Sequence, residues 1–287
     1  MATAATAPAG ATKIKAKMPK SKKKMLVFSG IVLLLLILAI AGPYIAPNDP
    51  YAAEFDLAKQ GPSSEFPMGT DKLGRCLFSR ILAGAGSTIF SALLLVLIIF
   101  IIGTLLGAIA GYVGGVTDMV IMRIVDIFLS FPDMVLALAV AGVLGSGMKN
   151  AIIAMAVIGW TKFARLARSQ VLSIKEDVFV QSARLSGNSS LAVLFKHILP
   201  NVAAPLVVTA TLDIGSNMMN LAGLSFLGLG AQPPTIEWGY MMSEGRSLLQ
   251  VCPWLVMFPG VAIFIAVVVF NLFGDAVRDV LDPRQSR

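Results

Sequence analysis

The sequence predicts an all-α membrane protein, because it combines little charge with apolar runs long enough to cross a bilayer. Of its 287 residues, 56% are hydrophobic and only 14% are charged, whereas a soluble domain carries about 25% charged residues. So few charges cannot cover a globule of this size in water, but a bilayer requires no such cover. We therefore expect one membrane domain rather than roughly two soluble ones.

The apolar runs predict helices rather than barrel strands. A strand that crosses a membrane has ~9–11 residues of alternating polarity, whereas these runs are about twice as long and apolar on all sides. A helix needs ~20 apolar residues to cross the hydrocarbon layer. We expect six transmembrane helices, at about 25–46, 82–112, 119–145, 150–170, 202–229 and 254–277.

The N-terminal segment resembles two kinds of signal. Residues 1–24 contain seven lysines and no acidic residue, and an apolar run follows at once. This order excludes a nucleic-acid patch. It fits either a basic tail before a first helix or a signal peptide, with a cleavage-like site at 39–41. The apolar run is longer than the ~7–15 residues of a signal-peptide core, so we expect a retained helix.

The distribution of charge predicts the orientation. The chain divides into a basic tail at 1–24, a first helix at 25–46, a loop at 47–80 and a core at 81–280 that carries five helices. A second tail at 281–287 follows. With both tails in the cytoplasm, 17 of the 23 Lys and Arg residues lie inside and six outside, as the positive-inside rule requires. The loop at 47–80 is then extracytoplasmic.

Candidate sites of catalysis are lacking in the sequence. No nucleophile, metal cluster, acid–base pair or Gly-x-x-x-x-Gly-Lys-Ser/Thr phosphate loop stands out. We therefore expect a non-enzyme without a cofactor or metal of its own. The two cysteines, Cys76 and Cys252, are too few for a disulfide framework, although one bridge between them stays possible.

The stretch 173–200 is too polar to span a membrane and too helix-compatible to be a plain loop. Gly187 suits a break between two short helices, and Pro200 suits entry into the next span. Two short helices joined at a glycine form a compact knob that a partner could grip. An interfacial helix in the lipid head groups fits the residues equally well.

Acidic residues within spans are the candidates for a functional site. Asp213 lies in the middle of the fifth span, and Asn217 follows on the same face. Buried acids in bilayers are costly and often functional, so this pair lines the pathway or joins two helices. Met218 could add a soft thioether, although methionine more often fills a core. For Asp126 and Asp133 we expect structural roles.

The stretch 173–200 also resembles the EAA loop of importer permeases of the ATP-binding cassette class. It matches at Ala183, Gly187, Leu199 and Pro200, and departs at Gln181, Ser182 and His197. Longer stretches at 68–75, 224–234, 237–239 and 270–284 resemble the C-type permease of the dipeptide, oligopeptide and nickel importer family. The similarity covers roughly residues 25–284.

The resemblance implies a fold and a set of partners. The fold would be that of a type I importer permease with cytoplasmic EAA coupling helices at about 176–200. The residues expected to contact the ATPase are Gln181, Ser182, Ala183, Arg184, Gly187, Leu199 and Pro200. The partners would be a second homologous permease, two ATP-binding subunits that carry ATP and Mg, an extracytoplasmic binding protein and membrane lipids, but no nucleic acid. The location would be the bacterial inner membrane.

The resemblance leaves the substrate open. Di- or oligopeptides are the first expectation, and nickel or a metal chelate is the alternative, because 184–187 and 211–215 look closer to the nickel branch. Ser216 stands where that branch has a histidine, and the one histidine, His197, lies on the predicted knob. An ion-coupled secondary transporter is a remote alternative, since no internal repeat is evident, and a scaffold that transports nothing is a third.

Overall fold

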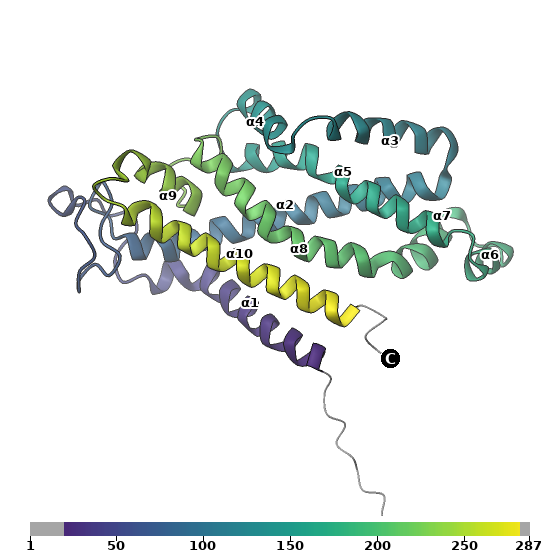
Figure 1. Cartoon of the computed structure of the whole chain (residues 1–287), viewed down its shortest axis with the longest axis horizontal. Helices are drawn as coiled ribbons and strands as arrows, with labels where there is room; N and C mark the ends of the chain where they lie inside the picture. Colours follow the sequence, from purple (N-terminus) through teal and green to yellow (C-terminus); the bar gives the residue numbers. More distant parts are fainter. Residues whose placement is uncertain (1–19, 282–287) are drawn as a thin grey trace, which may run out of the picture.

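The computed structural model describes residues 20–281, and this part of the chain is helical without a β-strand. The long helices run side by side in one bundle (Figure 1). Two short 3₁₀ turns, Phe55–Leu57 and Arg246–Leu248, accompany the helices. The helices are α1 (Lys20–Ile45), α2 (Leu77–Val113), α3 (Gly115–Leu129), α4 (Asp133–Leu144), α5 (Met148–Ile174), α6 (Val178–Leu185), α7 (Ser190–Ala192), α8 (Leu199–Phe226), α9 (Trp238–Gly245) and α10 (Trp254–Leu281).

Four or five of the six predicted spans are apolar enough to cross a membrane in the described residues. The helices α1, α2 and α10 and the continuous stretch Ser190–Phe226 each qualify, and the bent pair of α3 and α4 makes a fifth. The fourth predicted span corresponds to α5, which carries four basic residues at Lys149, Lys162, Arg165 and Arg168. Because of these charges, α5 is not among the helices that are apolar enough to cross a membrane.

The predicted span at 119–145 forms two helices rather than one. The chain forms α3 and α4 there, bent by 90° at a short break. Pro132 caps α4 with an extended ψ of 125°. A proline cannot donate a backbone hydrogen bond, and it disfavours the helical conformation of the residue before it. Pro132 was visible in the sequence, but the break that it introduces between α3 and α4 was not predicted.

Helices α2 and α5 pack closely in the centre of the bundle. Gly103, Gly107 and Gly111 recur at four-residue spacing on α2 and face α5. A Cβ at Gly103 or Gly107 would overlap backbone atoms of Trp160 or Ala164. Small residues allow two helix backbones to approach in this way. The glycine spacing thus fixes the position of the charged helix α5 within the bundle.

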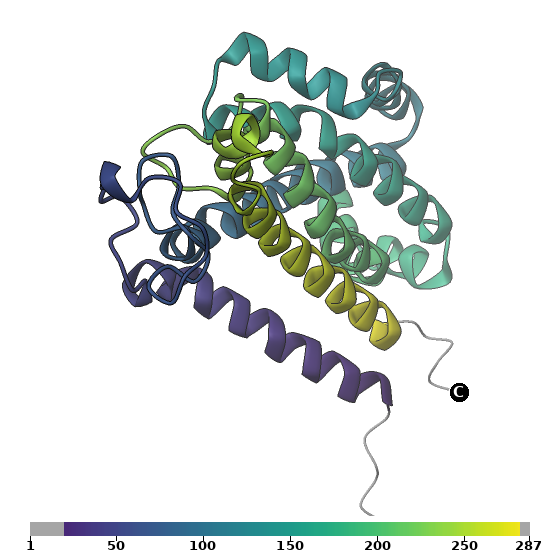
Figure 2. The ribbon, with the colours of Figure 1, turned by 60° about the vertical axis from the view of Figure 1, so that its left-hand side comes forward.

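The two ends of the described chain lie at the same end of the bundle. Lys24 of α1 and Asp279 of α10 form an exposed ion pair of 2.8 Å, and both helices run along the outside of the bundle (Figure 2). The predicted tails fall mostly outside the described residues, which begin at 20 and end at 281.

The segment 46–76 and α9 form a cap at the opposite end of the bundle (Figure 1). The predicted loop at 47–80 is therefore slightly too long, since α2 begins at Leu77 and includes Arg80. The sequence did not predict α9. Cys76 and Cys252 are both buried and both free, so the possible bridge between them is not formed.

Candidate functional site

The polar stretch after α5 forms two short helical pieces separated at Gly187. The first piece is α6, and the second runs from α7 through the π turn Val193–Ile198 into α8. Gly187 has a φ of 78°, a left-handed conformation that favours glycine. Its amide donates to the carbonyl of Arg184 at 3.0 Å. The break therefore depends on the residue type that the sequence places there.

One face of this segment is anchored on the bundle. Val180 and Ala183 of α6 pack with Val193, Leu194 and Ile198 against an apolar cluster of α2, α5 and α8. The guanidinium of Arg184 lies 5.2 Å from the ring centre of Tyr112 on α2. The position of α6 on the bundle is thus fixed by its buried face.

The opposite face is exposed and contains large apolar side chains. Val178 is 80% exposed, Leu185 is 90% exposed and Leu191 is 68% exposed. Gln181 and Ser182 are also exposed but bond to nearby backbone carbonyls. Of the predicted contact residues, Ala183 points inward, Leu199 is half-buried and Pro200 is exposed.

A second candidate site is a cavity of about 210 Å³ among α2, α3, α4, α5 and α8. The Lys162 ammonium lies 2.5 Å from Oδ1 of Asp213, and the side-chain amide of Asn217 donates to the backbone carbonyl of Asp213 at 2.9 Å. The cavity residues are Ile99, Leu129, Asp133, Met155, Ile158, Gly159, Thr161, Lys162, Asp213, Ser216, Asn217 and Asn220.

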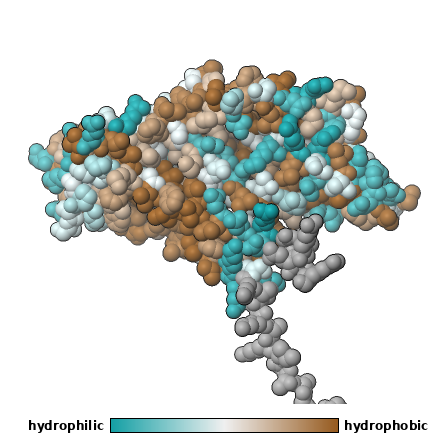
Figure 3. Space-filling model, in the orientation of Figure 1, coloured by the Kyte–Doolittle hydropathy of each residue, from teal (hydrophilic) through white to brown (hydrophobic). Residues whose placement is uncertain are grey.

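Two of the three predicted pathway residues line this cavity, and the third does not. Asp213 and Asn217, one turn apart on α8, both line it. Met218 is fully buried in the apolar core, so the prediction that it lines a pathway is corrected to core packing. Sequence reasoning missed Lys162, because it lies 51 residues from Asp213 and the orientation count places it with the cytoplasmic charges. In Figure 3, hydrophilic residues gather over α5 and α8 between apolar surfaces.

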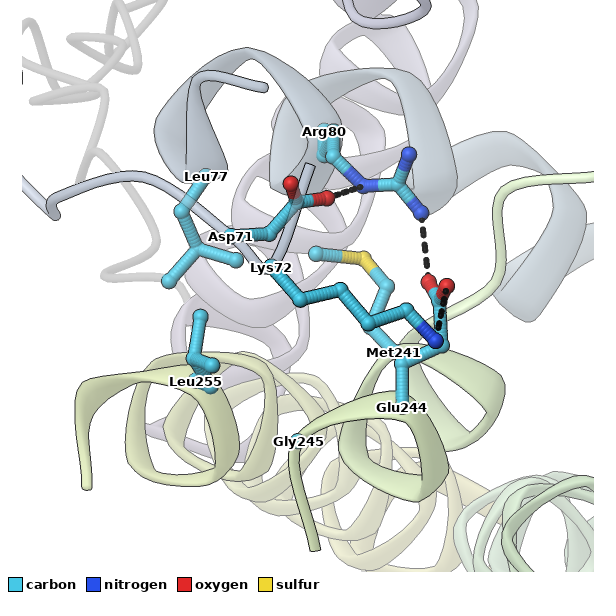
Figure 4. Close-up of a pocket in the computed structure, with 8 residues that line it drawn as sticks. All are labelled: Asp71, Lys72, Leu77, Arg80, Met241, Glu244, Gly245 and Leu255. Carbon is cyan, nitrogen blue, oxygen red and sulfur yellow. Dashed lines mark hydrogen bonds and ion pairs between the residues drawn. The ribbon is translucent and has the colours of Figure 1, made fainter. Parts of the chain in front are cut away.

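A third cluster fastens the cap to the bundle, and we call it the cap cluster: Asp71, Lys72, Arg75, Arg80 and Glu244. Figure 4 shows the Arg80 guanidinium between the carboxylates of Asp71 and Glu244. It lies 3.5 Å from Asp71 and 2.9 Å from Glu244, and Arg80 is only 3% exposed. Arg75 bonds Asp71 at 2.6 Å, and Lys72 approaches Glu244 at 3.4 Å.

Glu237 caps the first turn of α9 and is fully buried. Its carboxylate accepts from the amides of Gly239 and Tyr240 at 2.9 and 2.8 Å, and the hydroxyl of Thr88 lies 3.3 Å away. Burial raises the pKa of Glu237 above its ordinary value despite these donors. Burial likewise raises the pKa of the Tyr240 phenol. The first turn of α9 is therefore held by a carboxyl group that water does not reach.

Comparison with known proteins identifies the family. The family model described as binding-protein-dependent transport system inner membrane component matches residues 103–287. A second model, the N-terminal transmembrane domain of oligopeptide transport permease C, matches residues 21–62.

The chain belongs to the family of inner membrane components of binding-protein-dependent transport systems. A glutathione transport system permease protein of Pectobacterium atrosepticum is 44% identical, covering 88% of this chain and 84% of the relative. A dipeptide transport system permease protein of Alkalihalophilus pseudofirmus is 42% identical, over 92% and 87%. A probable D,D-dipeptide transport system permease protein of Escherichia coli is 44% identical, over 88% and 85%.

The fold of this inner membrane component is also found among solved structures. A chain of the MetNI methionine ABC transporter in an inward-facing conformation aligns with a TM-score of 0.56 at 19% identity. The alignment covers 70% of this chain and 96% of that one. The likeness is one of fold, and it agrees with the predicted membrane permease architecture of several helices.

Proposed function

We propose that this chain is a permease subunit of an ATP-binding cassette importer for peptides. With a second homologous permease it would form the translocation path for di- or oligopeptides. The observation that carries the proposal is the identity of 42–44% with permeases named for glutathione, dipeptide and D,D-dipeptide transport, over 88–92% of this chain. Nickel is the weaker choice, because none of these three relatives is named for a metal.

The helices support a six-crossing topology of the type I class. The bent pair of α3 and α4 would be one broken span. Helix α5 would be a span whose Lys162, Arg165 and Arg168 are each paired with an acidic residue of a neighbouring helix. The ion pair between Lys24 and Asp279 keeps α1 and α10 together at one end. That end would be cytoplasmic, since the lysines at the start of α1, Lys22 to Lys24, lie there.

The exposed face of α6 and α7 supports docking of an ATP-binding subunit. Large apolar side chains exposed on a polar end favour a partner that covers them, and Leu185 at 90% exposure is the clearest case. ATP and Mg would be bound by two such subunits, and this chain would be the non-catalytic part. The contact would include Gln181, Ser182, Arg184 and Gly187. Ala183 would hold α6 against the bundle, and α8 would begin with Leu199 and Pro200.

The proposal is tested by reconstituting the complete importer in liposomes. The complex would contain this chain, the partner permease, both ATP-binding subunits and the binding protein. We expect ATP-dependent uptake of labelled di- and tripeptides, and no competition from nickel chelates. ATP-dependent uptake of a nickel chelate without peptide uptake would contradict the proposed substrate.

The coupling role is tested by a glycine pair with matched geometry. Gly187 and Gly145 both have a positive φ, and at both positions an added Cβ would meet no atom closer than 4.0 Å. Both substitutions to Trp carry similar backbone strain. We expect Gly187→Trp to abolish peptide uptake and its coupling to ATP hydrolysis, and Gly145→Trp to retain most uptake. Normal uptake with Gly187→Trp would contradict the docking proposal.

A further inference from the structure

The Lys162–Asp213 pair is placed where a charge is expensive. Lys162 and Asp213 lie near the middle of α5 and α8, two helices that cross the membrane in the proposed topology. Charged side chains at membrane depth face a bundle interior or a water-filled cavity. The Lys162 side chain is 56% exposed, whereas that of Asp213 is 12% exposed. The lysine therefore lies on the open side of the pair and the carboxylate on the closed side.

The cavity around this pair has more acid than base. It contains one cation, Lys162, against two carboxylates, Asp213 and Asp133. Asp213 accepts one side-chain hydrogen bond among the described residues, from Lys162 to Oδ1, so Oδ2 is left for another donor. The remaining polar groups are neutral amides and hydroxyls, from Asn217, Asn220, Ser216 and Thr161. Such a site favours an ammonium group over an anion.

Peptides of different sequence share their main-chain groups and not their side chains. A path that passes many peptides can therefore recognise the α-ammonium, the amides and the α-carboxylate. The α-ammonium has the same charge and donor type as the Lys162 ammonium. When the α-ammonium of a peptide takes the place of the Lys162 ammonium at Asp213, one ammonium–carboxylate hydrogen bond replaces another. The resulting site is weak enough to release its cargo, as conduction requires.

We propose that Asp213 is a transient binding site for the α-ammonium of the peptide in transit, and that the peptide displaces Lys162 from it. The displaced Lys162 ammonium, on the open side, then pairs with the α-carboxylate of the same short peptide. The cavity of about 210 Å³ is smaller than the ~300–1,000 Å³ of sites that enclose whole ligands, and it accommodates the amino end alone. The inference rests on the proposed function as a peptide permease.

The test uses a double variant that carries both Lys162→Met and Asp213→Asn. It is compared with a control double variant in the reconstituted importer. Removing both charges avoids leaving one buried and unpaired. The control carries both Arg165→Met and Asp126→Asn, which remove an exposed ion pair of 2.8 Å between α5 and α3. Three quantities are measured: complex assembly, ATP hydrolysis stimulated by the binding protein, and peptide uptake per ATP. We expect the double variant to assemble and hydrolyse ATP, with uptake per ATP lowered about tenfold, the size of one charge-assisted hydrogen bond.

A second measurement needs no variant. A dipeptide and a desamino analogue that the binding protein also accepts are each presented at saturating concentration to the wild-type importer. We expect the analogue to enter about tenfold more slowly, and the two rates to become equal in the double variant.

The outcomes separate this site from a structural ion pair. Normal uptake per ATP in the double variant, or equal entry of dipeptide and analogue in the wild type, would overturn the proposal while leaving the peptide permease intact. A wild-type importer that moves no peptide would instead overturn the proposed function, and this site with it.

Discussion

The two ends of the bundle are constructed in opposite ways. At the cap, charged side chains are buried and paired, with Arg80 only 3% exposed between two carboxylates. At the α6–α7 end, apolar side chains are exposed, with Leu185 at 90%. A paired and buried end holds its shape by itself. Tyr51 and Phe55 are exposed at the cap as well, so the difference between the ends is the buried ion-pair cluster, which the α6–α7 end lacks among the described residues. We therefore expect the cap cluster to be rigid and the exposed face of α6 and α7 to be covered by a partner.

The largest effect is expected from breaking the cap cluster. Arg80→Met removes the most buried cation of the cluster, so among the described residues Asp71 and Glu244 keep only Arg75 and Lys72 as cationic partners. Breaking a buried ion pair costs about 3–5 kcal/mol, so we expect a large fall in thermal stability of the purified chain. Arg165→Met, which breaks an exposed pair, is the control and should change the melting temperature little. If the two variants lost equal thermal stability, the distinction between the buried and the exposed ion pair would be contradicted.

The next effect compares two glycines with the same backbone conformation. Gly74 in the cap has a φ of 80° and Gly187 has a φ of 78°. A Cβ at Gly74 would overlap the carbonyl of Glu54, whereas nothing lies within 4 Å at Gly187. We expect Gly187→Ala to cost about 1 kcal/mol of left-handed strain, and Gly74→Ala to cost more. Thermal denaturation of both variants measures the difference, and a larger loss at Gly187 would reverse the comparison.

A smaller effect concerns pH and Glu237. Its pKa is raised in the folded chain, so the folded state binds the proton more tightly than the unfolded state does. The stability from Glu237 is then complete below the ordinary pKa of about 4.3, and it is lost as pH rises through the folded pKa. We expect Glu237→Gln to flatten this dependence in melting curves recorded from pH 4 upward. An unchanged slope would mean that the carboxyl is not buried in solution.

The smallest effect on stability is expected at Leu185. Leu185→Ser changes a side chain that is already 90% exposed, so the melting temperature should move little. Peptide uptake per ATP should nevertheless fall, because the proposed contact with the ATP-binding subunit loses an apolar group. A lower melting temperature with unchanged uptake would indicate a structural role instead.

The sequence predicted the features that depend on local pattern. Long apolar runs predicted the helices, and Gly187 predicted the break after α6. Asp213 and Asn217 were singled out because four residues place them on one helix face. Each of these inferences needs only residues that lie close together in the chain.

The features that were missed depend on distant residues. Lys162 and Asp213 are 51 residues apart, and Arg80 and Glu244 are 164 apart, so their pairing is set by how the helices pack. The bend at Pro132 was missed because hydropathy averages across it. Met218 was misplaced because residue type does not reveal which side of α8 faces the core.

The central claim, that the exposed face of α6 and α7 docks an ATP-binding subunit, is tested most directly by site-specific cross-linking. Both natural cysteines are buried, so Leu185→Cys introduces an accessible thiol at the proposed contact. Val143→Cys, at a position that is 88% exposed in α4, is the matched control. We predict that a thiol cross-linker joins position 185 to the ATP-binding subunit in the assembled importer, with a yield that changes when ATP binds. No cross-link from position 185, or an equal yield from position 143, would contradict the account.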